Sequence, residues 1–451
     1  MLFLRADCNP SDAAVSPFAR LMKKLSLIEA HELRATLGSF ALVFMLMAGY
    51  YVLRPVRDSM ASDWSDAEVS TLWTFTFLFS FIATALYGLA ASRLRLKILV
   101  PGVYAFFAAS FVAVYLLTTA LPDPDLVNRF FYVWVSVFSL FQVSVFWSFM
   151  SDLYSTEQSQ RLFAFITTGA SVGAMVGPSV PVLFATELGN NNLLLIASAV
   201  LCATIPLIFF LQRLGAKELG SVHGGVGAAH IVDQKLGGNP LSGYRVFLQS
   251  PYLLAIGAFI FLYTGIGSFV YFELKNLMAA YSSEERTQIW GFMDLVVNTL
   301  TMLFGLFLTS RLTQRFGLAA TLALIPVLIV GGLLTVALVP MLWVVVGLQI
   351  FRRAGNYGVT RPAREMLFTA VDRETRFKAK QVADVVVYRG GDVFWAWSFT
   401  GLTAILGLGM AGVALVGATI AAAWAGLGIY LGRRFQEREH EQQDEQAAQP
   451  T

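Results

Sequence analysis

The chain has 451 residues, of which 56% are hydrophobic and only 14% are charged, and its mean hydropathy is +0.64. Soluble proteins carry about a quarter of charged residues, so this composition excludes an ordinary soluble domain. The formal net charge of +3 is too small to indicate binding to nucleic acid. Cys8 and Cys202 lie far apart and the chain has four histidines, so we expect no metal site and no cofactor.

Apolar runs of about 20 residues recur along the whole chain, and each is long enough to cross the roughly 30 Å hydrocarbon core of a bilayer as a helix. The sequence therefore predicts an all-α membrane protein with twelve transmembrane helices. In chain order these span 36–57, 71–91, 98–120, 129–150, 162–186, 193–212, 251–274, 288–310, 318–338, 342–369, 382–408 and 411–432.

The polar stretches divide the chain into two membrane bundles. We expect a cytoplasmic N-terminal segment (1–35), a six-helix bundle (36–212), a Gly-rich cytoplasmic linker (213–250), a second six-helix bundle (251–432) and a disordered tail (433–451). With the N-terminus inside, 22 Lys and Arg fall in cytoplasmic segments and only Lys275 and Arg286 in outer loops. This bias predicts that both termini are cytoplasmic.

Residues of similar kind recur at a nearly constant offset. A shift of 218 carries Arg57 onto Lys275, and a shift of 217 carries Gly173 onto Gly390. Together with six helices in each half, these matches predict a parallel six-plus-six repeat with a substrate site between the halves near the midplane. That is the major facilitator architecture.

Eight of the 32 basic residues fall inside or at the ends of membrane helices. A charge near the bilayer centre costs about 2.5–3.5 kcal/mol, so such residues face a cavity or a charged partner. The eight are Arg54, Arg57, Arg129, Arg352, Arg353, Arg361, Arg364 and Arg389. We expect Arg129, at a helix end, to be an interfacial anchor.

Arg54 and Arg57 are three residues apart and share a face of the first helix. They form either part of an anion site or an interfacial helix end at which Arg57 pairs with Asp58. Both arrangements satisfy the guanidinium groups, and the sequence alone leaves them open.

The tenth helix carries a regular polar face. At 100° per residue, four polar residues of this helix fall within an arc of about 80° on its circumference. They are Arg353, Tyr357, Arg361 and Arg364, and Pro362 is expected to kink this helix. Guanidinium groups match phosphate or carboxylate oxygens in bidentate fashion, which indicates an anion site. The alternative is an internal salt-bridge network.

Three acids are expected at membrane depth beside these arginines. They are Asp294 on the eighth helix and Asp384 and Asp392 on the eleventh, where Arg389 is also found. They are interpreted as counter-ions or a coupling-ion site, or else as satisfied buried carboxylates. The chain has no nucleophile elbow, phosphate loop or metal-ligand spacing, so we expect neither an enzyme nor an ATP-driven pump.

Three segments resemble the nucleotide (ATP/ADP) translocases of plastids and obligate intracellular bacteria, whose fold is major facilitator-like. They are 51–58 on the first helix, 271–275 on the seventh and 357–366 on the tenth. The resemblance implies exchange of nucleotides across a membrane. It also implies roles for Arg57, where the family has Lys, for Glu273, and for Arg364, Lys380 and Asp384.

The chain departs from the family pattern at several positions. Pro55-Val56 replaces an Asp-Thr pair, and Arg361 replaces an Asp before the tenth-helix proline. These changes resemble the branch found in free-living bacteria, which implies a location in the bacterial inner membrane. Such bacteria make their own ATP, so the substrate need not be ATP.

The leading interpretation is a secondary transporter that moves a small anionic, nucleotide-type substrate by alternating access. The predicted substrate-binding residues are Arg54, Arg57, Tyr357, Arg361, Arg364, Glu273, Lys380 and Arg389, and Asp294, Asp384 and Asp392 balance or couple the charge. Two alternatives remain open: a proton-coupled carrier of another organic anion, and a non-transporting assembly or signalling module on the same fold.

Overall fold

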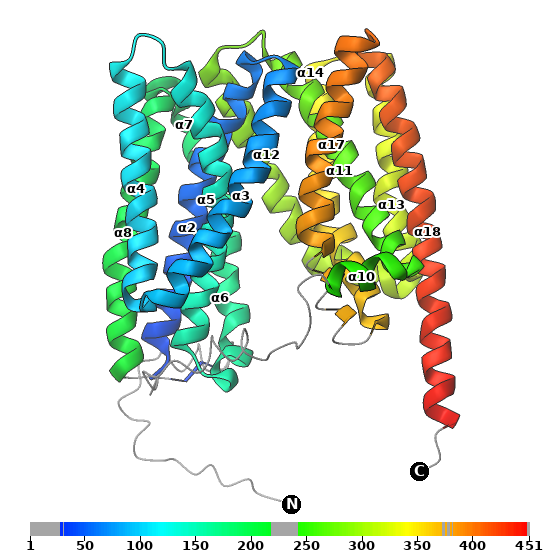
Figure 1. Cartoon of the computed structure of the whole chain (residues 1–451), viewed down its shortest axis with the longest axis horizontal. Helices are drawn as coiled ribbons and strands as arrows, with labels where there is room; N and C mark the ends of the chain where they lie inside the picture. Colours follow the sequence, from blue (N-terminus) through cyan, green and yellow to red (C-terminus); the bar gives the residue numbers. More distant parts are fainter. Residues whose placement is uncertain are drawn as a thin grey trace, which may run out of the picture.

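The computed structural model describes residues 28–217, 242–371 and 375–448, apart from residues 30, 377, 378 and 381. Every regular element in these ranges is a helix. Figure 1 shows two helix bundles side by side, the first formed by α2–α8 and the second by α11–α18.

The first bundle contains six membrane helices. They are α2 (Leu33–Met60), α3 (Asp66–Arg93), α4 (Leu96–Ala120), α5 (Asp125–Leu153), α6 (Thr156–Val176) continued by α7 (Ser179–Leu188), and α8 (Asn190–Lys217). The predicted fifth helix is thus two helices that meet at Gly177 and Pro178. Proline has no backbone N–H to continue the hydrogen-bond ladder, which accounts for the break.

The second bundle is less regular because several of its helices contain π turns. It comprises α11 (Pro251–Met278), α12 (Ser283–Leu303), the π turn η3 (Phe304–Leu308), α13 (Thr309–Leu338), α14 (Leu342–Gly355), the π turn η4 (Asn356–Thr360), α15 (Arg361–Leu367), η5 (Phe368–Ala370), the π turn η6 (Val382–Val387), α17 (Tyr388–Thr400), the π turn η7 (Gly401–Ile405) and α18 (Met410–Ala448). A short helix, α10 (Ser242–Gln249), precedes it.

Twelve membrane helices follow from these elements. Nine helical stretches in the described ranges are long and apolar enough to cross a membrane. One of them, Ser283–Leu338, has 56 residues and is two helices that meet at Gly317, whose φ of 80° favours glycine. The remaining two are the tenth (α14–α15) and eleventh (η6–η7) helices, which are interrupted by π turns and carry arginines. The prediction of twelve helices is confirmed.

The repeat is visible in the helix boundaries themselves. α2 and α11 both have 28 residues, and their ends are related by a shift of 218. The next helix begins with the same capping box in each half: Ser65 caps with Glu68, and Ser282 caps with Glu285. The predicted six-plus-six repeat is therefore confirmed.

The two ends of the molecule differ. The described N- and C-terminal residues lie at one end, here called the terminal end (Figure 1). The opposite end, here called the far end, holds the α2–α3 and α11–α12 turns.

Within the first bundle α6 packs directly on α2. A Cβ atom at Gly169 would lie 2.5 Å from the Phe40 carbonyl oxygen, and a Cβ atom at Gly177 would lie 2.6 Å from the Ala48 carbonyl oxygen.

The chain between and after the bundles differs from the predicted outline. α18 continues as a helix to Ala448, whereas a disordered tail is predicted from residue 433. The predicted linker (213–250) overlaps the end of α8 and contains α10, and its residues 218–241 lie outside the described residues. Residues 1–27 of the predicted N-terminal segment also lie outside them.

Candidate functional site

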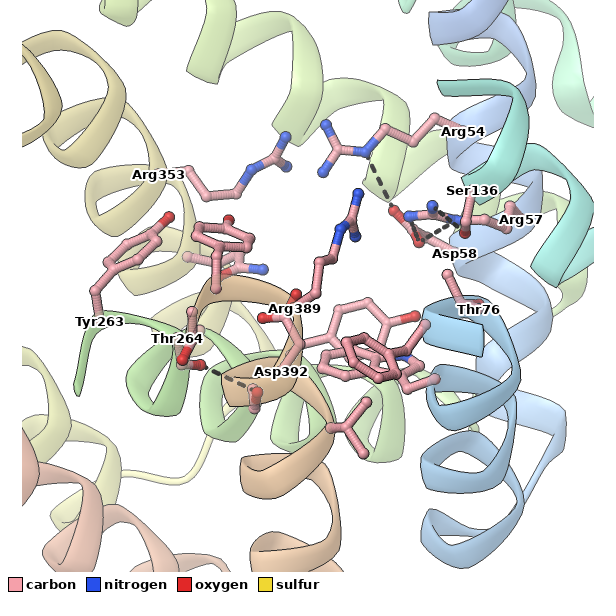
Figure 2. A pocket seen from close by; sticks show the side chains of 18 of the residues that line it. Arg54, Arg57, Asp58, Thr76, Ser136, Tyr263, Thr264, Arg353, Arg389 and Asp392 are labelled. Atoms are coloured by element: carbon pink, nitrogen blue, oxygen red, sulfur yellow. Dashed lines mark hydrogen bonds and ion pairs between the residues drawn. The ribbon is translucent and has the colours of Figure 1, made fainter. Parts of the chain in front are cut away.

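A polar cavity of about 190 Å³ lies between the two bundles. Its wall is formed by α2, α3 and α5 from the first half and by α11, α12, α14, η4 and α17 from the second. Figure 2 shows the polar side chains pointing into it from both sides. The cavity is thus placed as the repeat predicts, between the halves.

Positive charge dominates this cavity. Five arginines line it: Arg54, Arg57, Arg352, Arg353 and Arg389. Asp58 and Asp392 are the carboxylates in the same wall, and Asp294, which is not part of the wall, pairs with two of the arginines. Five guanidinium groups against three carboxylates leave a formal excess of two positive charges.

The two arginines of α2 share one buried acid. Arg57 Nη2 lies 2.5 Å from Asp58 Oδ1, and Arg54 Nε lies 3.6 Å from Asp58 Oδ2. Arg57 Nη1 also donates a hydrogen bond of 3.1 Å to Ser136, and its guanidinium lies over the Tyr132 ring. The Arg57–Asp58 pair considered as an alternative therefore forms, and Arg57 lines the cavity as well.

Asp294 connects the two halves through an ion pair. Its carboxylate is 1% exposed and lies 2.6 Å from Arg353 Nη1 of its own half and 3.4 Å from Arg54 Nη1 of the other. Figure 2 shows the Arg54 and Arg353 guanidiniums facing each other from opposite sides of the cavity, with Arg389 pointing toward them from below. Asp294 is thus a counter-ion to two cavity arginines.

Arg352 and Arg389 differ from the other three arginines. Among the described residues, neither has a carboxylate within 4.0 Å. Arg352 Nε donates a hydrogen bond of 3.0 Å to Gln349, and its guanidinium lies over the Tyr263 ring at 5.6 Å. Asp392 in the same wall interacts with both at longer range, so their guanidinium groups keep hydrogen-bond donors for an anion. Arg352 lines the cavity but is not among the substrate-binding residues predicted from the sequence, although the adjacent pair Arg352-Arg353 in an apolar helix is a signal for it.

Aromatic side chains form the rest of the wall. The Tyr132 and Tyr271 hydroxyls, one from each half, lie 2.9 Å apart, and Trp73 Nε1 donates a hydrogen bond of 2.8 Å to Tyr132. The Tyr271 and Trp290 rings lie 5.5 Å apart. Flat rings beside guanidinium groups can hold a heterocycle as well as an anion.

Several predicted site residues lie outside the cavity wall. Arg364 pairs with Glu365 at 3.0 Å and with Asp384 at 3.4 Å, and Lys380 pairs with Glu365 at 2.6 Å. These four residues form a separate charged cluster, which we call the α15–η6 cluster. Arg361 is exposed and also lies outside the wall. Of the two arrangements considered for the polar face of the tenth helix, Arg364 thus takes part in a salt-bridge network, whereas Arg353 and Tyr357 line the cavity.

The π turn η4 explains why the predicted face of the tenth helix divides. A π turn holds an extra residue compared with an α turn, so every residue after it is rotated by about 100° from its α-helical position. Pro362 cannot donate to the Gly358 carbonyl, and the Thr309 hydroxyl donates to that carbonyl instead. Arg353 and Tyr357 therefore face the cavity, whereas Arg361 and Arg364 do not.

Glu273 is buried inside the second half and does not line the cavity. It is 2% exposed, and neither carboxylate oxygen has a hydrogen-bond partner among the described residues.

Lys275 is predicted in an outer loop, but it is buried and lies in the last turn of α11. Sequence reasoning places Lys275 and Arg286 in solvent because their helices end close by.

Both of these cations instead join the halves at the far end. Lys275 Nζ lies 2.8 Å from Asp66 and donates to the Trp64 carbonyl at 3.0 Å. Arg286 Nη1 lies 2.5 Å from Asp63. These contacts hold the two halves together at the far end.

Two similar six-helix halves around a central polar cavity define a multi-pass membrane transporter. The profile of the Major Facilitator Superfamily matches residues 39–368, and the chain belongs to this superfamily. It is 21% identical over 446 residues to ADP,ATP carrier protein 1 of Chlamydia muridarum (strain MoPn / Nigg), a match that covers 84% of each chain. It is also 21% identical over 465 residues to the protein of that name from Chlamydia pneumoniae, covering 87% of this chain and 88% of that one.

Solved structures share the fold. The nucleoside transporter NupG superposes with a TM-score of 0.59 at 14% identity, covering 90% of this chain and 98% of NupG. A bacterial homolog of the human lysosomal transporter Spinster, in an inward-facing conformation, superposes with a TM-score of 0.59 at 13% identity, covering 91% of this chain and 99% of that one.

Proposed function

We propose that this transporter moves an anionic, nucleotide-type substrate through the central cavity by alternating access. The observation that carries the proposal is the formal excess of two positive charges that remains when Asp58, Asp392 and Asp294 are set against the five cavity arginines, in a wall that also offers tyrosine and tryptophan rings. Buried guanidinium groups need partners, and phosphate oxygens provide bidentate ones. Support also comes from the 21% identity to proteins named ADP,ATP carriers.

We assign the first contact with the anion to Arg352 and Arg389, because no carboxylate lies within 4.0 Å of either among the described residues and Asp392 acts on them only at longer range. Arg54, Arg57 and Arg353 form the second set, since Asp58 and Asp294 compete for them. The cavity volume of about 190 Å³ is below the roughly 300–1,000 Å³ of sites that enclose a drug-sized ligand. In this arrangement, we infer, the cavity encloses the phosphate end of a nucleotide.

The far-end contacts suggest a sidedness for the transport cycle. If the terminal end faces the cytoplasm, as the distribution of Lys and Arg predicts, this arrangement is closed toward the outside. We propose that the bacterial inner membrane holds the protein in this orientation. Alternating access then requires the Lys275–Asp66 and Arg286–Asp63 pairs to separate in the opposite state.

The test is uptake of labelled ATP by proteoliposomes that contain ADP, with ATP, ADP, AMP, adenosine, inorganic pyrophosphate and a dicarboxylate as competitors. We expect competition by ATP and ADP, strong loss of uptake in Arg352→Gln and Arg389→Gln, and normal uptake in the matched control Arg361→Gln, whose arginine lies outside the cavity. Competition by the dicarboxylate as strong as that by ADP would reject the nucleotide proposal. Absence of ATP uptake by proteoliposomes that do take up labelled dicarboxylate would also reject it.

A proton-coupled carrier of another organic anion is the second candidate, and Asp392 favours it. This carboxylate lines the cavity and has no Lys or Arg within 4.0 Å among the described residues. Asp392→Asn should then abolish uptake driven by a pH gradient and leave exchange of substrate for substrate intact. A normal response to the pH gradient in Asp392→Asn would reject coupling through this residue.

A further inference from the structure

One helix of the second half, α12, makes polar contacts with the first half along much of its length. Asn190 donates to Ser283 at 2.8 Å, and Gln288 donates to the Val182 carbonyl at 3.1 Å. Farther along, Asn298 donates to the Ala174 carbonyl at 2.8 Å. We call this row of contacts the α12 seam. Asp294 lies between Gln288 and Asn298 and contributes the ion pair with Arg54 to the same seam.

The ion pairs of Asp294 are close but poorly aligned. Arg353 Nη1 lies 2.6 Å from the carboxylate, yet neither oxygen of Asp294 and neither Nη of Arg353 makes a hydrogen bond of good geometry among the described residues. The same holds for Nε of Arg54. Buried guanidinium groups in this condition have donors left for another acceptor, and both arginines line the cavity.

We propose that Asp294 is an internal anion that competes with the substrate for Arg54 and Arg353. The proposal rests on the proposed function because it takes the substrate to be an anion. In the empty transporter Asp294 forms ion pairs with both arginines, and its pair with Arg54 stabilises the middle of the α12 seam. A substrate anion first held by Arg352 and Arg389 reaches the neighbouring Arg353, draws it and Arg54 away from Asp294, and so loosens the seam.

The physical reason for this coupling is the geometry of the charges. Asp294 and Arg353 belong to the second half, so the attraction of Asp294 for Arg54 is the one that crosses to the first half. A bound anion that satisfies the open donors of both arginines replaces Asp294 in its attraction for them, but it is not attached to α12. Substrate binding therefore replaces the attraction between Arg54 and the Asp294 carboxylate, which is part of α12, by an attraction between Arg54 and the substrate anion, which can leave.

The test is anion affinity of the purified full chain, measured by titration calorimetry with inorganic pyrophosphate, ATP and ADP. Asp294→Asn removes the competing charge and nearly keeps the shape of the side chain. We expect it to bind pyrophosphate at least tenfold more tightly than the unmodified protein, which corresponds to about 1.4 kcal/mol. Asp384→Asn is the matched control: it breaks an arginine pair of the same 3.4 Å length outside the cavity and should leave affinity within about twofold.

A purely structural role for Asp294 predicts the opposite result. Losing the carboxylate would then lower thermal stability and leave pyrophosphate affinity unchanged or weaker. That outcome, or absence of pyrophosphate binding by the variant, would overturn the proposal. If Asp294→Asn does not give folded protein, Asp294→Ser is measured in its place, because the smaller side chain leaves room for water beside the two guanidiniums.

The titrations with ATP and ADP distinguish failure of this inference from failure of the proposed function. If the unmodified protein binds ATP but Asp294→Asn binds it no more tightly, the competition is rejected and the proposed function stands. If neither protein binds ATP or ADP but the variant gains affinity for pyrophosphate, the competition stands and the nucleotide assignment is wrong.

Discussion

The Lys275 ammonium lies 2.8 Å from the Asp66 carboxylate and joins the last turn of α11 to the first turn of α3. Lys275 is 1% exposed, whereas the Asp66 side chain is 17% exposed. Asp66 also accepts hydrogen bonds from Asn276 at 3.1 Å and from Thr403 at 3.2 Å. The pair therefore joins the halves at the far end. Buried Lys275 has Asp66 as its counter-ion, whereas Asp66 has two other donors and partial contact with solvent.

This asymmetry predicts unequal costs for the two single substitutions. Asp66→Asn leaves a buried ammonium without its counter-ion and should lower the free energy of unfolding by about 3 kcal/mol, the lower end of the range for a broken buried pair. Lys275→Met should cost about 1 kcal/mol, because Asp66 keeps two other donors and partial contact with solvent. Denaturation of the purified variants measures both. A larger loss for Lys275→Met than for Asp66→Asn contradicts this account.

Arg364 and Arg389 should respond in opposite ways to the same substitution. Arg389→Gln should weaken anion binding by about ten- to a hundredfold, because a charge-assisted hydrogen bond contributes about 1.5–3 kcal/mol, and should change stability little. Arg364→Gln removes the central cation of the α15–η6 cluster and should lower the melting temperature while affinity stays within about twofold. Melting temperature and affinity are measured on both variants. Equal loss of affinity in the two would show that the cluster takes part in binding.

The close packing of α6 on α2 predicts the effect of an added methyl group. Gly173 lies against the Phe44 carbonyl, so Gly173→Ala forces the helices apart and should cost about 1–3 kcal/mol. Gly102, inside α4, has no such atom within 4 Å, and Gly102→Ala should be neutral or stabilise by about 0.5–1 kcal/mol. Thermal unfolding of the two variants measures the difference. Equal melting temperatures for the two variants would show that α6 and α2 can move apart without loss of stability.

The orientation in the membrane is predicted by the distribution of Lys and Arg. Reporter fusions at Gly225 and after Arg434 should both report a cytoplasmic location. A fusion in the turn between α11 and α12, after Tyr281, should report the opposite side and serves as the control. A periplasmic signal from either of the first two fusions would reverse the proposed sidedness.

Arg353 and Arg364 mark the limit of what the helical pattern of the tenth helix predicts. An α-helical period places both on one face, and Pro362 indicates a kink. The size of the resulting rotation depends on the π turn η4, which forms where Thr309 from α13 supplies the hydrogen bond that proline cannot. That contact is between residues 49 positions apart, so no local pattern contains it.

The sequence by itself determined the twelve helices, the repeat and the presence of arginines at membrane depth. The hydrocarbon core imposes a fixed length on each helix and a cost on each charge, and both leave a mark on every segment separately. Only the tertiary structure decided that Arg352 joins Arg389 in the cavity, that Arg364 pairs with Asp384 outside it, and that Lys275 is buried against Asp66. Which acid neutralises which arginine depends on distances between helices, and those arise only when the two halves pack together.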